Sequence, residues 1–515
     1  MRYTYILIII VIIFCITYHF ISNKEKLNIN TSLSVDFMDE NVLRIRCQFK
    51  EFDWLEPYLD KSVKETIGSG FFVNDKGNII TNFHVIENAI KVFVQIPKYG
   101  NNTYECDVIS IYPHMDIGLL KIKNYKNEKY FKLGNSDMIK KGNKSFAIGY
   151  PMGQNKYKIT SGIISGYQDG DIQTDSPINP GNSGGPLVNE KMEVIGINYS
   201  GYANAQNVGY AIPINFLKII LSDMYKKKII YNPILGCSFN NTTDIILKYS
   251  NLCKSGYFIS YIGKNSPMDN SNIKVGDILC SVDGLKIDNY GEIKIIKNNS
   301  FFHIFDYLNY KKVGDIIIFE VLTYDKNKNK YKLLEKKVKL ESNLYYKINN
   351  KYPQFENIDY QIIGGLVIME LTLNHFNILK KNNNIIKYKR IDKLIEPKLI
   401  ITKVIKSSKL AEDNIFKESC ILEKVNNIKV KNLKDLRRAL LKVQENNTYK
   451  FISFLTETNK IIILDPKKID EEEKLLSKKI NYPLTKFTLQ LLDYYKNIYT
   501  TPGLTKEESS PLHGK

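Results

Sequence analysis

This sequence has no closely spaced cysteine pairs and no cofactor-binding motifs. Its seven cysteines form no C-x-x-C pair, which argues against a metal site and against a disulfide framework. Several of them lie in apolar, strand-like runs, where a buried thiol behaves as a small hydrophobic side chain. No metal-binding or nucleotide-binding motif appears either. We therefore expect a protein that works without a metal ion or another cofactor.

Acidic residues are too few to balance the basic ones. The 515 residues include 73 Lys and Arg against 54 Asp and Glu, which gives a formal net charge of +19. A basic chain raises the question of nucleic acid, but no zinc-finger, RNP or helix-turn-helix pattern accompanies the charge. The excess is lysine, scattered through segments rich in Asn, Ile and Tyr, whose codons are A/T-rich. We attribute the charge to genome composition and expect no nucleic-acid partner.

The one long hydrophobic run lies at the N-terminus. Residues 3–21 are apolar or aromatic apart from two threonines and one histidine. This length lies between a signal-peptide core and a membrane span, and no small-x-small cleavage site follows it. Residues 1–22 are therefore predicted to be a signal peptide or membrane anchor, and residues 23–36 a leader. An address for an organelle, a mitochondrion or plastid, is the alternative.

Histidine is scarce, with six residues in the chain, and this narrows the search for catalytic groups. The β-rich segment after the leader holds His84 and His114, and His114 lies two residues before Asp116. A glycine-rich turn, residues 179–187, presents Ser183. A serine hydroxyl becomes a nucleophile when a histidine accepts its proton and a carboxylate orients that histidine. The order His84, Asp116, Ser183 predicts such a triad.

The turn around the serine offers a second catalytic element. A residue without a side chain tolerates unusual backbone angles, so Gly181 allows its own N–H group and that of Ser183 to face one point. Two such donors would form an oxyanion hole. The same residues also suit an ordinary turn rich in Asn and Gly. His114 is the alternative base, but it would point to the same face as Asp116 rather than across a cleft.

Seven sequence blocks extend this pattern. They are residues 68–72, 81–85, 116–120, 147–153, 174–186, 194–198 and 209–213. In this order they resemble the HtrA/Deg serine proteases of the chymotrypsin-like clan, and Tyr150-Pro151 with the long C-terminal region resembles the plant-type Deg branch. The resemblance implies His84 as the base, Asp116 as its orienting partner and Ser183 as the nucleophile. It makes Asp175, an alternative carboxylate, a structural residue ahead of the serine turn.

Short β-rich runs broken by Gly, Asn and Pro occupy residues 37–225. The runs are residues 70–73, 92–96, 117–122, 145–150, 162–165 and 193–198. Their spacing is typical of two small antiparallel barrels. In the resembling fold His84 and Asp116 come from the first barrel and Ser183 from the second, so that substrate lies between them as an extended strand. The loop 199–207 would shape a specificity pocket for a modest apolar side chain.

A lysine run at residues 226–228 marks a linker, and residues 232–345 resemble a PDZ domain. Such domains add a peptide strand to a sheet edge and receive its terminal carboxylate on backbone N–H groups of a glycine turn. Leu235, Gly236 and Cys237 would supply that turn. The alternative is a strand–loop joint that binds no ligand.

A second, weaker PDZ-like domain is predicted for residues 346–468. Its carboxylate turn would be residues 364–368. Asn427 stands where such a domain usually has Gly. Asn also tolerates the left-handed conformation, so the turn can survive this replacement. We expect weak binding of peptide ends there. Residues 469–515 read as a helical tail that begins with the cap-like run at Asp470.

The sequence as a whole predicts a mainly β protein: a chymotrypsin-like double β-barrel followed by two PDZ-like α+β domains, behind an N-terminal hydrophobic segment. The expected function is ATP-independent serine endopeptidase activity on unfolded or damaged proteins. Expected partners are unfolded protein or peptide substrates, peptide C-termini and, from the resemblance, further copies of the chain in a trimer or a multiple of one. The alternative is a non-catalytic chaperone or PDZ scaffold. We expect a secretory-pathway location, membrane-tethered or secreted.

Overall fold

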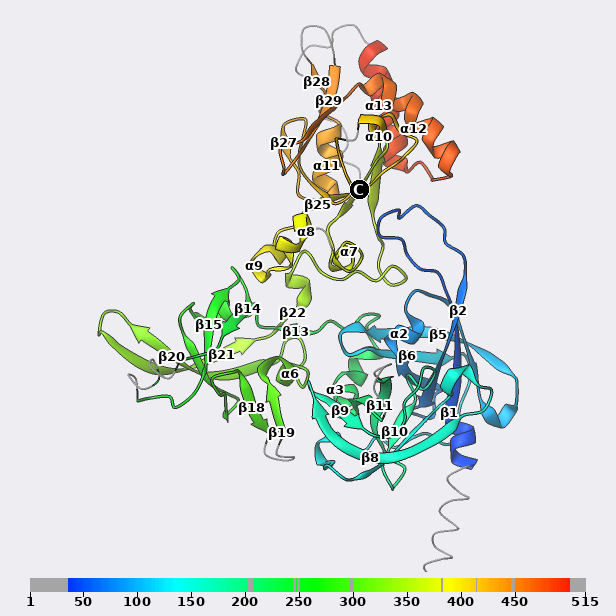
Figure 1. Ribbon diagram of the computed structural model, residues 1–515, viewed down its shortest axis with the longest axis vertical. Coiled ribbons are helices and arrows are strands. Elements are labelled where there is room, and N and C mark those ends of the chain that lie inside the picture. Colours follow the sequence, from blue (N-terminus) through cyan, green and yellow to red (C-terminus); the bar gives the residue numbers. More distant parts are fainter. Residues whose placement is uncertain are drawn as a thin grey trace, which may run out of the picture.

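Two β-barrels and two larger β-sheets follow one another along the chain (Figure 1). The computed structural model describes residues 36–201, 207–243, 247, 251–295, 300–380, 383–413, 415–445 and 450–500. The expected anchor or signal segment and almost all of the leader lie outside these residues. Within the described ranges, no helix is both long enough and apolar enough to span a membrane. The expected mainly β architecture is confirmed.

The first barrel closes in the strand order β1-β2-β3-β6-β5-β4. Its strands are β1 (Val42–Phe49), β2 (Lys64–Phe72), β3 (Asn78–Asn82), β4 (Ala89–Gln95), β5 (Thr103–Tyr112) and β6 (Ile117–Ile122). Successive side chains point to opposite faces, so Phe72 fills the barrel interior while Phe71 packs into a core shared with the second barrel. Asn82 pairs with Ile117, which brings the short helix α2 (Phe83–Ile86) beside the turn η2 (Pro113–Met115).

The second barrel closes in the order β10-β11-β12-β9-β8-β7. Its strands are β7 (Lys144–Gly149), β8 (Lys158–Gln168), β9 (Asp171–Thr174), β10 (Pro186–Val188), β11 (Val194–Gly201) and β12 (Gly209–Pro213). Helix α3 (Ile214–Met224) follows β12 and buries Phe216 and Leu217 in the shared core. The two barrels are therefore joined by a continuous apolar core, and the serine turn lies between β9 and β10.

The next sheet has the order β14-β15-β16-β20-β21. Its module contains β13 (Pro233–Ile234), β14 (Cys237–Asn240), β15 (Tyr257–Ile262), α5 (Pro267–Asn270), β16 (Ile278–Val282), β17 (Leu285–Lys286), β18 (Glu292–Ile295), β19 (Ser300–His303), α6 (Ile304–Leu308), β20 (Ile316–Asp325), β21 (Lys330–Lys339) and β22 (Glu341–Ser342). Cys253 and Cys280 form a disulfide here. The sequence predicted no disulfide framework, and it did not indicate this single pair, because folding brings together cysteines whose spacing in the sequence follows no motif.

The last sheet has the order β23-β24-β25-β26-β29-β28. Its strands are β23 (Tyr360–Ile363), β24 (Leu366–Glu370), β25 (Leu399–Val404), β26 (Cys420–Val425), β27 (Ile428–Lys429), β28 (Gln444–Glu445), β29 (Lys450–Thr456) and β30 (Ile461–Leu464). Its helices are α7 (Leu373–Ile378), α8 (Asn383–Ile386), α9 (Ile391–Leu394), α10 (Lys409–Asp413), α11 (Leu433–Leu440), α12 (Pro466–Ile480) and α13 (Lys486–Thr500). The predicted start of α12 at Asp470 was wrong, since Asp465 caps the helix and Pro466 occupies its first turn.

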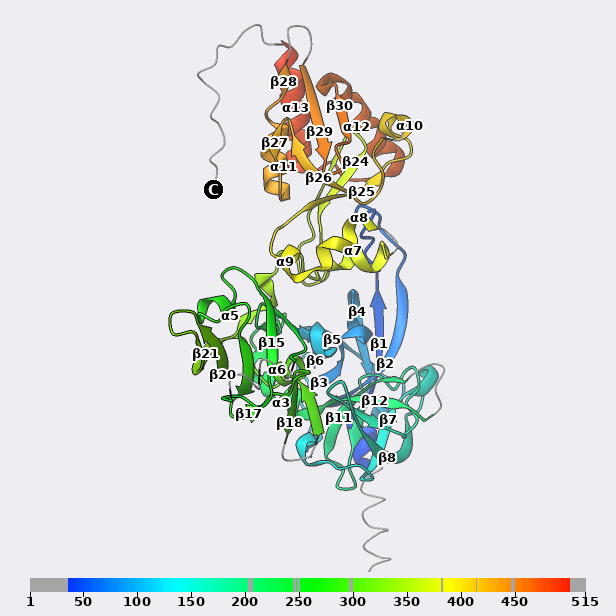
Figure 2. The same ribbon diagram turned by 60° about the vertical axis from the view of Figure 1, so that its left-hand side comes forward.

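A long loop connects the first barrel to the last module. Residues 50–63, between β1 and β2, rise from the barrel to that module in both views (Figure 2). Trp54 is 7% exposed in an apolar cluster of the last module, and its ring makes a T-shaped contact with that of His375, with 5.4 Å between centroids. The ring of Tyr58 lies 5.7 Å from that of Tyr482. The loop therefore docks the last module onto the barrel through aromatic contacts.

We expect Trp54→Ala to weaken this docking. Truncating a buried Trp to Ala costs about 3–5 kcal/mol, because apolar contacts are lost and a cavity is left. Calorimetric melting of the full chain should show the last module unfolding at a lower temperature. Leu59→Ala, which truncates an exposed side chain of the same loop, is the matched control. Equal melting temperatures for the two variants would contradict the docking role.

Candidate active site

His84 and Asp116 form the best-defined polar pair of the first barrel. His84 lies in α2, directly after β3, and Asp116 lies between η2 and β6, so the pairing of β3 with β6 places them side by side. The Nδ1 atom of His84 lies 2.7 Å from Oδ2 of Asp116, and the His84 backbone N–H donates to Oδ1 at 2.8 Å. Both carboxylate oxygens are thereby directed to one residue, which fixes the orientation of the imidazole.

The backbone of Asp116 is held as firmly as its side chain. It caps η2 in the left-handed conformation, with φ of 51°, which Asp adopts more readily than most residues. Its carbonyl oxygen accepts hydrogen bonds from the Phe83 N–H at 3.0 Å and from Nδ2 of Asn82 at 2.9 Å. The end of β3 therefore positions both partners of the pair.

The serine turn is a compact backbone structure that requires glycine. The N–H of Asn182 donates to Asn179 and that of Gly185 donates to Asn182. Gly181 has a φ of +99°, and a Cβ atom there would lie 2.2 Å from the carbonyl oxygen of Tyr150. A Cβ atom on Gly184 would lie 2.9 Å from the backbone nitrogen of Asn82. The turn thus lies against the end of β3, from which α2 carries His84.

The Ser183 hydroxyl points to a backbone acceptor. Among the described residues its one hydrogen-bond partner is the carbonyl oxygen of Tyr199, to which Oγ donates at 3.1 Å. The structure therefore joins His84 to Asp116 but does not join Ser183 to His84. Catalysis requires the hydroxyl to leave Tyr199 and turn toward the imidazole.

Two backbone donors of the serine turn are available for a ligand. In the described part of the chain, no acceptor takes the N–H of Gly181 or that of Ser183. The Met152 N–H donates to the carbonyl oxygen of Pro180 at 2.6 Å, and this oxygen belongs to the same peptide group as the Gly181 N–H. In a trans peptide group the C=O bond and the N–H bond point in opposite directions. The Gly181 N–H therefore faces away from Met152.

The alternative catalytic residues have other roles in the structure. Nε2 of His114 lies 3.1 Å from Oδ1 of Asn309, at the end of α6, so His114 contacts the following module. Asp175 accepts the Ile163 N–H on Oδ1 and ties the segment before the serine turn to β8. Neither residue is paired with Ser183.

A buried acid supports the residue that holds the serine hydroxyl. The hydroxyl of Tyr199 donates to Oδ2 of Asp171 at 2.7 Å. Burial raises the pKa of Asp171 to about 6. The hydrogen bond from Tyr199 acts to lower this pKa, whereas the charge of nearby acids such as Asp306 raises it further. No sequence motif pointed to this pair beyond the predicted loop 199–207, of which residues 202–206 lie outside the described residues.

The first of the two C-terminal modules, which contains β13 to β22, has an open sheet edge beside helix α6. Among the described strands, β14 ends the sheet and pairs with β15 alone. Gly236, in the predicted turn Leu235-Gly236-Cys237, has a φ of +72°, and a Cβ atom there would lie 2.4 Å from the Cβ atom of Ser266. The ring of Phe239 on β14 faces that of Phe305 on α6 at 5.8 Å. A peptide strand could pair with this edge.

In the second C-terminal module, the strand that follows the glycine turn, β24, is not at the edge of the sheet. Gly364 and Gly365 of the predicted carboxylate turn, both with positive φ, form a tight hairpin between β23 and β24. Strand β23 thus occupies the edge of β24. Arg437 of α11 fastens it through a two-point ion pair with Asp359, at 2.7 Å for each bond. The sequence could not reveal that the preceding strand folds back.

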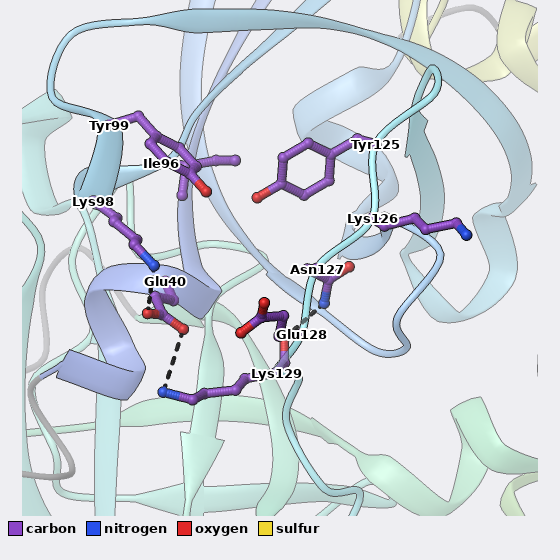
Figure 3. Close-up of a pocket in the computed structure, with 9 residues that line it drawn as sticks. All are labelled: Glu40, Ile96, Lys98, Tyr99, Tyr125, Lys126, Asn127, Glu128 and Lys129. Atoms are coloured by element: carbon purple, nitrogen blue, oxygen red, sulfur yellow. Dashed lines mark hydrogen bonds and ion pairs between the residues drawn. The ribbon is translucent and has the colours of Figure 1, made fainter.

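A polar cavity of about 150 Å³ lies elsewhere on the first barrel (Figure 3). Glu40 enters it between two lysines, with its carboxylate 2.8 Å from Nζ of Lys98 and 3.6 Å from Nζ of Lys129. The hydrogen bond from Lys98 lowers the pKa of Glu40. None of the proposed catalytic residues lines this cavity.

Comparison with known proteins follows the same division of the chain. A family model described as a trypsin-like peptidase domain matches residues 68–197, and a model described as a PDZ domain matches residues 350–483. The chain is similar to HtrA/DegP serine proteases over part of its length. It carries a trypsin-like peptidase domain and a PDZ domain, and the PDZ match falls on the module with the filled edge.

The relatives of this HtrA/DegP-like chain match about half of it. A probable serine protease do-like of Buchnera aphidicola is 36% identical over 252 residues, 46% of this chain and 52% of the relative. The periplasmic serine endoprotease DegP of Escherichia coli K12 is 33% identical over 244 residues, 44% of this chain and 50% of the relative. The chain thus spans about half the length of these relatives. A solved structure, the HtrA-type protease AlgW with tripeptide, covers 60% of this chain and 96% of its own, with 23% identity and a TM-score of 0.46.

A buried acid in the tail of the HtrA/DegP-like chain yields a pH prediction. Glu473 of α12 accepts the Gly364 N–H at 2.8 Å and the Tyr482 hydroxyl at 2.7 Å, and burial raises its pKa to about 7. The folded chain then holds this proton more tightly than the unfolded chain. The stabilisation is present at low pH and is lost as the pH rises through the folded pKa.

We expect the Glu473→Gln variant to keep its stability as the pH rises, because it has no carboxyl proton to lose at this position. In urea melts, the free energy of unfolding of the wild type should fall by about 1–3 kcal/mol more than that of the variant between about pH 5 and pH 8. Glu471→Gln, at an exposed position of the same helix, should follow the wild type. Parallel pH profiles for all three proteins would show that Glu473 does not titrate in this range.

Proposed function

We propose that the chain is an ATP-independent serine endopeptidase that hydrolyses unfolded or damaged proteins. The observation that carries the proposal is the doubly bonded His84–Asp116 pair beside a serine turn with two available N–H donors. The trypsin-like peptidase match and the serine endoprotease relatives support the same reading. No step requires a metal or a nucleotide.

Each group of the site acts twice, first when the acyl-enzyme forms and again when water releases the acyl group. Oγ of Ser183 attacks the scissile carbonyl while Nε2 of His84 takes its proton, and the imidazolium then gives that proton to the leaving amine. Asp116 keeps the proton of His84 on Nδ1 and stabilises the cation. The N–H groups of Gly181 and Ser183 hold the oxyanion. Water releases the acyl group by the same path in reverse.

The surrounding modules define the proposed partners. Residues 37–225 would form the protease domain and residues 232–345 the PDZ domain that captures peptide C-termini, with Leu235, Gly236 and Cys237 receiving the carboxylate beside the open edge of β14. Residues 346–468 would form a second PDZ-like domain, and the helices after it would belong to the tail. Assembly as a trimer or a multiple of one, and placement in the plant-type Deg branch, rest on the sequence resemblance.

We place the protein in the secretory pathway, membrane-tethered or secreted. The hydrophobic segment of residues 1–22 and the periplasmic designation of the Escherichia coli relative support this location. Targeting to a mitochondrion or plastid is the alternative.

A non-catalytic chaperone or scaffold is the second candidate. One observation favours it: the Ser183 hydroxyl is bonded to Tyr199 rather than to His84. A protein that only binds unfolded chains would have no need to break that bond.

We expect Ser183→Ala to abolish cleavage of casein by the full chain. The variant loses the nucleophile but keeps every backbone bond of the serine turn, so its circular dichroism and its binding of peptide ends should match the wild type. A fluorophosphonate, which labels an activated serine, should mark the wild type alone. Cleavage that persists in the variant would refute the assignment of the nucleophile. A wild type that binds casein without cleavage or labelling would favour the chaperone.

A further inference from the structure

Ser69 is a buried polar residue that the proposed mechanism does not use. It lies on β2 of the first barrel between Gly68 and Gly70 and is 0% exposed. Both glycines are in close contact with neighbours: a Cβ atom on Gly68 would lie 2.6 Å from a methyl group of Val85, and one on Gly70 would lie 2.7 Å from a methyl group of Ile45. The path of β2 through Ser69 is therefore fixed by packing on both sides.

The hydrogen bonds of Ser69 cross from the first barrel to the second. Its Oγ donates to the carbonyl oxygen of Gly181 at 2.6 Å and accepts the Tyr150 N–H at 3.0 Å. Its own N–H donates to the carbonyl oxygen of Ser183 at 2.8 Å. One residue thus holds the carbonyl groups of both residues whose N–H groups would form the oxyanion hole.

These bonds restrain a part of the chain that has little restraint of its own. Gly181, with a φ of +99°, has no side chain to limit rotation of the peptide groups on either side of it. Met152 holds the peptide group before Gly181 through the oxygen of Pro180, and Ser69 holds the peptide group after it. Rotation of the first peptide group would change the direction of the Gly181 N–H, and rotation of the second would shift the segment that leads to the Ser183 N–H.

We propose that Ser69 is a positioning residue for the oxyanion hole, acting from the first barrel on Gly181 and Ser183 of the second. This inference rests on the proposed endopeptidase function. Ser69 touches no substrate atom. It keeps the two N–H donors aimed at one point before the oxyanion forms, which is the condition under which such donors stabilise a transition state.

The test compares Ser69→Ala with Ser110→Ala in the full chain. Ser110 is also 0% exposed, and its Oγ also donates to a backbone carbonyl at 2.6 Å, that of Lys227, but it makes no contact with the serine turn. We expect Ser69→Ala to lower kcat about 10- to 100-fold. This loss is no larger than the smallest decrease in kcat seen when a whole oxyanion-hole donor is removed, about 100-fold. KM should stay within about threefold, and fluorophosphonate labelling should slow in proportion to kcat.

Ser110→Ala should keep kcat within about threefold of the wild type, while its melting temperature falls about as far as that of Ser69→Ala. Ser69→Cys, whose thiol is a weaker donor, should give an intermediate kcat and serves if Ser69→Ala does not fold.

The outcomes separate this inference from the proposed function. A wild type that neither cleaves casein nor reacts with the fluorophosphonate overturns the endopeptidase and the positioning role together. An active wild type, with Ser69→Ala and Ser69→Cys no slower than Ser110→Ala, overturns the positioning role alone. A loss seen only in KM would also overturn it, because the defect would then lie in substrate binding.

Discussion

The close approach of two backbones at the seam between the barrels is the constraint on which the site depends. A Cβ atom on Gly184 would lie 2.2 Å from the carbonyl oxygen of Ser69 in the first barrel, so this position has no room for a side chain. Cβ atoms on Gly181 or Gly185 would lie 2.1–2.2 Å from carbonyl oxygens at the end of β7 in the second barrel, so the turn is equally tight on that side. The apolar core shared by the barrels holds the two backbones at this separation. The geometry of the candidate site is therefore a property of the seam, and neither barrel would present it alone.

The sequence was informative where chemistry is local to a motif. Scarcity and order singled out His84, Asp116 and Ser183, and the β-rich runs predicted the barrel strands, with the run 117–122 matching β6. Contacts between distant residues left no such signal. Ser69 and Gly181 are 112 residues apart, and Cys253 and Cys280 pair across 27 residues without a motif. The partner of the Ser183 hydroxyl is a matter of side-chain rotation, which no pattern of residue types records.

The two C-terminal modules show how one sheet plan can serve two purposes. In the first, β14 ends the sheet and its outer edge is unpaired by any described strand. In the second, the chain before the corresponding strand returns as β23 and takes that edge itself, with Arg437 fastening it to α11. Backbone donors that a ligand strand would use are thus already paired. The first module leaves an edge with which a strand could pair, whereas the second contacts the tail helices and the loop from the barrel.

The loop from the first barrel has a further consequence, because Trp54 is the one tryptophan of the chain. Its indole lies in the last module, while its backbone belongs to the loop between β1 and β2 of the first barrel. Burial lowers the pKa of the adjacent His375 to about 4, so this ring stays uncharged near neutral pH. The chain therefore contains its own optical probe, whose ultraviolet emission reports separation of these two regions without any added label.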